Sequence, residues 1–164
     1  MKKINIVIFG ATGSIGNSTL SIINKHHQNF NIEGITCNKN INKLLNIAKK
    51  YKIKKIGFNK NSKLKKPELK YFNTFSNISD FHKIISAKTD IIIFAISGLS
   101  SLDLLIKILK SGKKVGIANK ECIISLGNNF MKIARKFSTQ IIPLDSEHNS
   151  IFHLLKNQLG NYKS

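Results

Sequence analysis

Short apolar runs rich in β-branched residues alternate along this chain with longer segments in which apolar residues recur at helical spacing. This alternation is typical of a parallel sheet covered by helices on both faces. Two runs, residues 91–96 and 115–118, are apolar on both faces, as buried parallel strands are. The pattern predicts strands at residues 4–9, 32–36, 55–58, 91–96, 114–118 and 140–144.

Helical spacing in the intervening segments predicts helices at residues 14–24, 41–51, 79–87, 99–109 and 121–137. Gly112 follows the fourth of them, where a left-handed residue commonly ends a helix. The lysine-rich stretch 60–70 contains Pro67 and is interpreted as a loop with a marginal helix. The expected fold is therefore α/β, a Rossmann-like doubly wound parallel sheet.

The composition of the chain narrows its class. With 164 residues, 41% of them hydrophobic, the chain can bury one ordinary core. No apolar run has the length of a membrane span, and the first residues do not form a secretion signal. Cys37 and Cys122 are too few and too far apart for a disulfide framework or a zinc site. We therefore expect a soluble, cytoplasmic protein with free thiols, neither of them a nucleophile, and no membrane partner.

The formal net charge of +19 by itself suggests nucleic acid as a partner. The lysines are spread along the chain among Asn and Ile, however, and neither a nucleic-acid motif nor a clustered set of Arg accompanies them. Solvated helix faces explain most of the charge. We expect no nucleic-acid partner. A basic, non-enzymatic polyanion-binding module stays the alternative, and a steep loss of RNA affinity with salt would reveal it.

Residues 10–16, Gly-Ala-Thr-Gly-Ser-Ile-Gly, join the first predicted strand to the first predicted helix. Such a turn lets the backbone approach a pyrophosphate, while the helix N-terminus offers N–H donors and the positive end of its dipole. Thr12 and Ser14 add hydroxyl groups. The pattern also fits a tight turn with Ser14 as the helix cap, but its strand-turn-helix setting favours dinucleotide binding.

The end of the second predicted strand bears on the choice between NAD and NADP. An NAD enzyme commonly has Asp or Glu there, against the ribose 2′-hydroxyl. Residues 36–40 read Thr-Cys-Asn-Lys-Asn instead, without a carboxylate. Lys39 and Asn40 can meet a 2′-phosphate through charge-assisted hydrogen bonds, although Lys39 can also be one more surface lysine. The residues favour NADP.

Two polar clusters follow later strands, where ligands bind in open α/β sheets. They are Ala118-Asn119-Lys120-Glu121 and Asp145-Ser146-Glu147-His148-Asn149. Asp145 and Glu147 are two residues apart, so in an extended segment they can share a hard divalent cation, with Ser146 free to contact a substrate. The same residues fit the start of a helix capped by Asp145 or Ser146. Spacing alone leaves both a Mg²⁺ or Mn²⁺ site and a capped helix open.

In their order and spacing these motifs resemble those of the 1-deoxy-D-xylulose 5-phosphate reductoisomerase family. The matching strings are Gly13-Ser14-Ile15-Gly16, Lys39-Asn40, Ala118-Asn119-Lys120-Glu121 and Asp145-Ser146-Glu147-His148-Asn149-Ser150-Ile151-Phe152. The last two are the specific ones, because dinucleotide turns recur in many families. The resemblance implies an oxidoreductase of isoprenoid precursor synthesis. With NADPH and Mg²⁺ or Mn²⁺, it would rearrange and reduce 1-deoxy-D-xylulose 5-phosphate, a small phosphorylated sugar, to 2-C-methyl-D-erythritol 4-phosphate.

The resemblance also implies a role for each matching residue. Residues 1–144 would form the NADPH-binding domain, residues 145–164 would begin the metal- and substrate-binding region, and the full-length form would be a homodimer. The NADPH contacts would be Thr12, Gly13, Ser14, Ile15, Lys39, Asn40, Asn119 and Glu121. The catalytic, substrate-binding residues would be Lys120, Ser146 and Glu147, and the metal ligands would be Asp145 and Glu147.

The chain departs from the family's usual pattern in several places. Asn38 stands where Gly is usual, and can reach the left-handed backbone region or offer only its N–H group. Ser101 and Cys122 replace a usual Gly and Ser. The chain also ends before the region that supplies a further metal carboxylate, the phosphate-binding residues and a mobile loop, so we expect no turnover from it alone. Another NADP-dependent reductase, such as an aspartate-semialdehyde dehydrogenase, is the alternative enzyme, but it needs a catalytic Cys that neither thiol provides.

Overall fold

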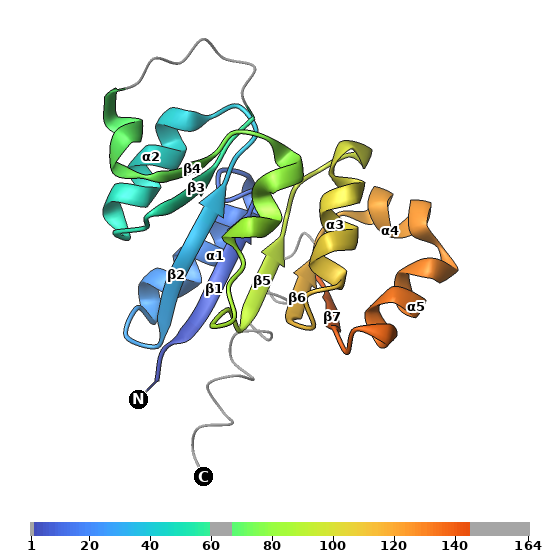
Figure 1. The fold of residues 1–164 in the computed structure, drawn as a ribbon. Coiled ribbons are helices and arrows are strands. Elements are labelled where there is room, and N and C mark those ends of the chain that lie inside the picture. The colour runs from blue at the N-terminus through green and yellow to red at the C-terminus, as the bar shows by residue number, and fades with distance from the viewer. Residues whose placement is uncertain (1, 60–66, 145–164) are drawn as a thin grey trace.

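The computed structural model describes residues 2–59 and 67–144. Its centre is a seven-stranded sheet with the order β4-β3-β2-β1-β5-β6-β7 (Figure 1). Every pair of neighbouring strands is parallel. The α/β, doubly wound fold expected from the sequence is thereby confirmed. The strands are β1 (Ile4–Phe9), β2 (Phe30–Thr36), β3 (Lys55–Gly57), β4 (Asn73–Phe75), β5 (Ile91–Phe94), β6 (Lys114–Ile117) and β7 (Gln140–Pro143).

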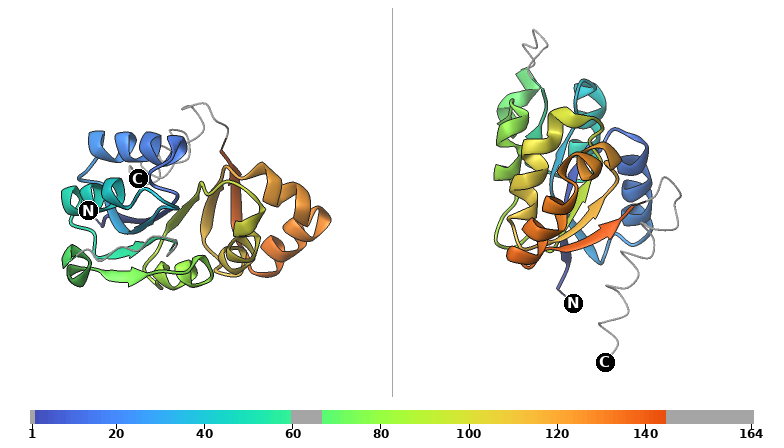
Figure 2. Two further views of the ribbon diagram at one scale, coloured as in Figure 1. Left: turned by 90° about the horizontal axis from the view of Figure 1, so that it is seen from above. Right: turned by 90° about the vertical axis from the view of Figure 1, so that its right-hand side faces the viewer.

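Helices connect the strands and lie on both faces of the sheet, with α1 on one side and α3 on the other (Figure 2). Within the described ranges, none of them is long and apolar enough to cross a membrane. The α-helices are α1 (Ser14–Lys25), α2 (Ile41–Lys50), α3 (Leu102–Leu109), α4 (Lys120–Leu126) and α5 (Asn128–Lys136). The 3₁₀ helices are η1 (Pro67–Tyr71), η2 (Ile78–Ile84) and η3 (Leu99–Ser101).

The side chains of β1 alternate between two apolar cores. Ile6 and Ile8 pack in the core that contains the buried residues of α1 and α2. Val7 and Phe9 pack in the core that contains those of α3 and α5. Successive strand residues point to opposite faces, so a central strand covered on both faces must be apolar at every position. This is why β5, and β1 from Ile6 to Phe9, are continuous apolar runs.

The strand order reverses direction at β1. The chain adds β2, β3 and β4 on one side of β1, then returns to add β5, β6 and β7 on the other. The connections that follow β1 and β5 therefore run in opposite directions and leave a crevice at the carboxyl ends of these strands. In open α/β sheets, this switch point is where ligands bind.

The structure differs from the sequence prediction in three elements. β4 was missed because its three residues are exposed or half-buried and carry no apolar pattern. The helix expected at residues 79–87 is the 3₁₀ helix η2. The single helix expected at residues 121–137 is divided into α4 and α5 at Gly127, whose φ of +49° interrupts the helical backbone. The left-handed end expected at Gly112 is confirmed by its φ of +66°.

Candidate functional site

The glycine-rich turn after β1 is attached to the end of β2 by one buried residue. The Oγ1 atom of Thr36 accepts a hydrogen bond of 3.0 Å from the Gly10 amide. The backbone carbonyl oxygen of Thr36 accepts a second hydrogen bond, of 2.8 Å, from the Ala11 amide. Because Thr36 is completely buried, both bonds are shielded from water. The turn is therefore held in a defined position before any ligand arrives.

The three glycines of the turn are required for different reasons. Gly10 has a φ of +89°, and a β-carbon there would lie 2.4 Å from the carbonyl oxygen of Ala95. A β-carbon at Gly16 would lie 2.4 Å from the Gly10 oxygen. At Gly13 such a carbon would lie 3.5 Å from the Gly10 oxygen, which is ordinary van der Waals contact. Packing within the protein therefore explains glycine at positions 10 and 16, whereas position 13 calls for a reason outside the protein.

Helix α1 begins directly after Gly13, with Ser14 as its first residue. Gly13 occupies the cap position and no side chain caps the helix, so the alternative in which Ser14 is the cap is wrong. The first amides of a helix have no acceptor within the helix. The start of α1 thus carries N–H donors, the positive end of the helix dipole and the Ser14 hydroxyl.

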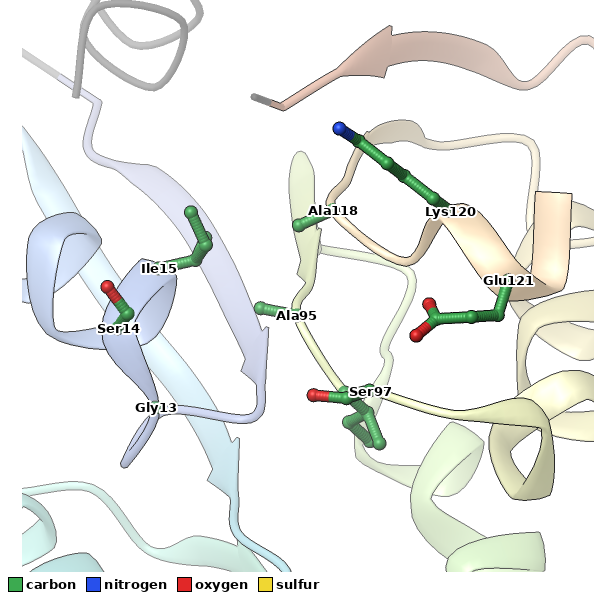
Figure 3. Close-up of a pocket in the computed structure, with 9 residues that line it drawn as sticks. Gly13, Ser14, Ile15, Ala95, Ser97, Ala118, Lys120 and Glu121 are labelled. Atoms are coloured by element: carbon green, nitrogen blue, oxygen red, sulfur yellow. The ribbon is translucent and has the colours of Figure 1, made fainter. Parts of the chain in front are cut away.

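A cavity of about 340 Å³ lies at the switch point of the sheet. The start of α1 forms one wall with Gly13, Ser14 and Ile15, and Lys120 and Glu121 at the start of α4 form the wall opposite (Figure 3). The residues between the two walls are Ala95, Ile96, Ser97 and Ala118. Two motifs that are far apart in the sequence therefore face each other across one space of the size of a small-ligand site.

Asn119, expected to face NADPH, is only 2% exposed and does not line this cavity. Its Nδ2 donates to the carbonyl oxygens of Ile96 at 2.6 Å and Gly98 at 3.1 Å, and to Ser101 Oγ at 3.1 Å. Its Oδ1 accepts from the Cys122 amide at 2.8 Å and so caps α4. The side chain connects the loop after β5 to the start of α4, and these bonds account for its donors and acceptor. A contact between Asn119 and a cofactor would have to use its backbone.

We expect Asn119→Ala to lower the free energy of unfolding by about 2–4 kcal/mol, since it removes a helix cap and leaves buried carbonyl groups without a donor. Urea denaturation followed by circular dichroism measures this loss. Asn129→Ala, at an exposed position in α5, is the matched control and should change stability by less than about 0.5 kcal/mol. Equal stability of the two variants would show that the buried network contributes nothing.

Ser101 and Cys122, the two later departures from the family's usual residues, lie against each other in this network. The Ser101 Oγ and the Cys122 Sγ are 3.6 Å apart. Both contact the Gly98 carbonyl oxygen, at 2.9 Å and 3.4 Å respectively. Both side chains are fully buried. Ser101 and Cys122 thus occupy one site in the core. The hydrogen bonds of Asn119 form although both residues differ from the family's usual ones.

The structure gives neither thiol the properties of a nucleophile. Burial raises the pKa of the Cys37 thiol to about 12, so this group is protonated at neutral pH. Cys122 has no exposed surface. This agrees with the sequence interpretation of both residues as unreactive thiols.

The segment expected to meet the ribose end of the cofactor lies after β2, beside the glycine-rich turn. Lys39 is exposed at its surface. Asn40 caps α2, because its Oδ1 accepts a 3.1 Å hydrogen bond from the Lys43 amide. Asn38 does not adopt the left-handed backbone that the usual Gly would allow, since Lys52 and Ser138 are the non-glycine residues with positive φ in the described part of the chain. Neither Lys39 nor Asn40 lines the cavity.

Some residues of the cavity and its surroundings are not among those predicted from the sequence. Ala95, Ile96 and Ser97 line the cavity directly after β5. This strand ends at Phe94, two residues before the predicted end at residue 96. Ligands bind beyond the carboxyl ends of strands, which is why the clusters at residues 118–121 and 145–149 are candidates. Ser97, which follows β5, is a candidate for the same reason. Lys43, whose ammonium group reaches the glycine-rich turn, carries no sequence signal that separates it from the other lysines.

Asp145, Ser146 and Glu147 lie outside the described residues. The last described residue, Leu144, is buried, and its amide donates a 2.8 Å hydrogen bond to the Ile117 carbonyl oxygen. Within residues 2–59 and 67–144, no three His, Cys, Asp or Glu side chains lie close enough together to hold a metal ion. The acidic pair therefore stays a prediction from the sequence.

This chain is similar in sequence to known reductoisomerases. Residues 6–127 match the model of the family described as 1-deoxy-D-xylulose 5-phosphate reductoisomerase. The enzyme of that name from Pelagibacter ubique (strain HTCC1062) is 40% identical over 168 residues, covering 98% of this chain and 42% of its own length. That from Wigglesworthia glossinidia brevipalpis is also 40% identical, over 94% of this chain and 41% of its own length.

Solved structures agree with the sequence matches. The 1-deoxy-D-xylulose 5-phosphate reductoisomerase from Zymomonas mobilis in complex with NADPH superimposes with a TM-score of 0.80 at 28% identity. The match covers 93% of this chain and 41% of that protein. A DOX-P reductoisomerase in complex with NADPH, fosmidomycin and magnesium gives a TM-score of 0.75 at 28% identity, over 92% of this chain and 38% of that protein.

The chain spans about two fifths of the length of these relatives, since it covers 41–42% of the two enzymes above. The match to the family model extends over most of the chain, from β1 through α4, and includes both walls of the cavity. This chain belongs to the 1-deoxy-D-xylulose 5-phosphate reductoisomerase family.

Proposed function

We propose that this chain is the NADPH-binding part of an enzyme that rearranges and reduces 1-deoxy-D-xylulose 5-phosphate to 2-C-methyl-D-erythritol 4-phosphate. One observation carries the proposal: the glycine-rich turn and the Lys120–Glu121 pair face each other across one cavity at the switch point of the sheet. An element suited to phosphate binding would then lie opposite charged side chains that could act on a substrate. Relatives named 1-deoxy-D-xylulose 5-phosphate reductoisomerase, one of them in complex with NADPH, support the assignment.

The residues of the turn fit the diphosphate of NADPH. The N–H groups at the start of α1 and the Ser14 hydroxyl can donate to phosphate oxygens, with Thr12 and Ile15 on either side. Gly13 leaves room for a phosphate, because little protein packs against the position of its missing side chain. When bound, NADPH supplies the hydride for the reduction.

The opposite wall of the cavity would orient the reacting end. The side chains of Lys120 and Glu121 both point from α4 toward the side of the cavity where α1 begins (Figure 3). The Lys120 ammonium would contact the substrate and stabilise negative charge that develops on its oxygen atoms. Glu121 would contact NADPH, and Asn119 would hold both neighbours in place through its buried hydrogen bonds.

The remaining predicted site residues follow Leu144 in the sequence. Asp145 and Glu147 would hold a Mg²⁺ or Mn²⁺ ion, and Ser146 and Glu147 would contact the phosphorylated sugar. A divalent ion bound there would supply Lewis-acid polarisation of the substrate carbonyl. The complete enzyme would be a cytoplasmic homodimer, and residues 1–144 would form its cofactor domain.

We expect the isolated chain to bind NADPH more tightly than NADH, because no carboxylate follows β2 and Lys39 lies beside the expected ribose site. Lys39→Ala should weaken NADPH binding roughly tenfold to a hundredfold, which corresponds to about 1.5–3 kcal/mol for one charge-assisted contact. Calorimetric titration of the wild-type chain and of Lys39→Ala with NADPH and NADH measures these affinities. Equal affinity of the wild-type chain for the two cofactors would contradict the expected preference for NADPH.

A further inference from the structure

Lys43 is anchored at both ends of the residue. Its backbone amide donates to the Asn40 Oδ1 at 3.1 Å, in the cap of α2. Its Nζ donates to the carbonyl oxygen of Thr12, also at 3.1 Å, and so bridges the segment after β2 to the turn after β1. The side chain is half-buried, whereas that of Lys39 is exposed. Lys43 therefore holds a positive charge in a defined place between these two segments.

This place corresponds to one end of the cofactor. In a dinucleotide-binding α/β fold, the diphosphate lies at the start of the first helix, and the ribose 2′ position lies at the end of the second strand. Lys43 extends from the start of α2 to the glycine-rich turn, so its side chain would pass along the adenosine ribose. The ammonium of Lys43 is therefore on the side where a 2′-phosphate would lie.

The charge on Lys43 is available to a ligand. An ammonium group has three donors, and the bond to Thr12 uses one of them. The first turn of α2 contains no acidic residue. In the described part of the chain, the ion pairs within 4.0 Å are Lys49–Glu68 and Lys83–Asp80, and neither involves Lys43.

We propose that Lys43 is a specificity-determining residue that recognises the ribose 2′-phosphate of NADPH. This inference rests on the proposed function, because it concerns the same cofactor. Lys43 is already ordered by its bond to Thr12, so little side-chain freedom remains to be lost when a phosphate binds. Lys39, which is exposed, must be ordered by the ligand itself. Lys43 therefore contributes more than Lys39 to the discrimination between NADPH and NADH.

Two nucleotide fragments test the proposal on the chain as it is. Adenosine 2′,5′-bisphosphate carries the 2′-phosphate, adenosine 5′-monophosphate lacks it, and both occupy only the adenosine end of the site. We expect Lys43→Met to weaken binding of the bisphosphate about a hundredfold, more than Lys39→Ala does, and to leave binding of the monophosphate unchanged, as loss of one charge-assisted contact predicts. Lys43→Arg should retain most of the affinity for the bisphosphate. Lys50→Met removes the same charge from the last turn of the same helix and should change neither affinity.

The outcomes separate this inference from the proposed function. If Lys43→Met weakens both fragments equally, Lys43 only positions the turn and the inference is overturned. It is overturned as well if Lys43→Met binds both fragments like the wild type, or if Lys39→Ala loses more affinity for the bisphosphate than Lys43→Met does. If the wild-type chain does not prefer the bisphosphate, the NADPH assignment fails and the inference fails with it. Thermal unfolding of each variant shows that the fold is retained.

Discussion

Gly13→Ala should abolish NADPH binding while the protein keeps nearly all its stability. The backbone of Gly13, with φ −82° and ψ −179°, is open to any residue. A β-carbon there meets only ordinary contact within the protein, so the change should cost less than about 1 kcal/mol, chiefly through a weaker helix cap. The same carbon would project into the space that a diphosphate needs for contact with the start of α1.

Gly16→Ala is the matched comparison for this prediction, and it should lower stability much more than Gly13→Ala does. Its β-carbon would be 2.4 Å from the Gly10 oxygen and 2.6 Å from Ala11, so the turn must shift. We expect a loss of about 3 kcal/mol or more in the free energy of unfolding. Urea denaturation and NADPH titration of both variants distinguish the two effects. Tight NADPH binding by Gly13→Ala would show that the diphosphate does not lie against this turn.

Asp145→Asn should reduce turnover at least about a hundredfold in the completed enzyme, with this chain joined to the C-terminal part of a family member. The substitution removes half of the anionic charge that Asp145 and Glu147 would offer to Mg²⁺ or Mn²⁺. Thermal stability should stay near that of the unmodified enzyme, because Asn caps a helix about as well as Asp. The assay is Mn²⁺-dependent oxidation of NADPH with 1-deoxy-D-xylulose 5-phosphate.

Asp103→Asn is the matched control, since it neutralises an exposed carboxylate in the first turn of α3. It should leave turnover unchanged within about twofold, as surface changes far from a site usually do. A role of Asp145 only as a helix cap predicts normal turnover in Asp145→Asn as well. That result would remove the metal site from the proposed mechanism.

The sequence by itself determined the α/β class and the two elements that face the cavity. A strand that is apolar at every position, such as β5, or at every position but one, such as β1 with Asn5, has few alternatives to a sheet buried on both faces. Ligands of such a sheet bind at the carboxyl ends of its strands, so the turn at residues 10–16 and the cluster at residues 118–121 could be identified from their position in the chain. Local pattern and one topological rule sufficed for these predictions.

Only the tertiary structure decided what the individual polar side chains do. Asn119 and Lys120 are adjacent in one motif, yet Asn119 is buried and Lys120 lines the cavity. Lys39 and Lys43 are both lysines after β2, yet only Lys43 is bonded to the Thr12 oxygen. These differences depend on carbonyl groups that folding brings from distant strands and loops. Every residue type has the same backbone carbonyl group, so the sequence does not show which carbonyls will accept a hydrogen bond. No pattern in the sequence could therefore separate the anchored side chains from the exposed ones.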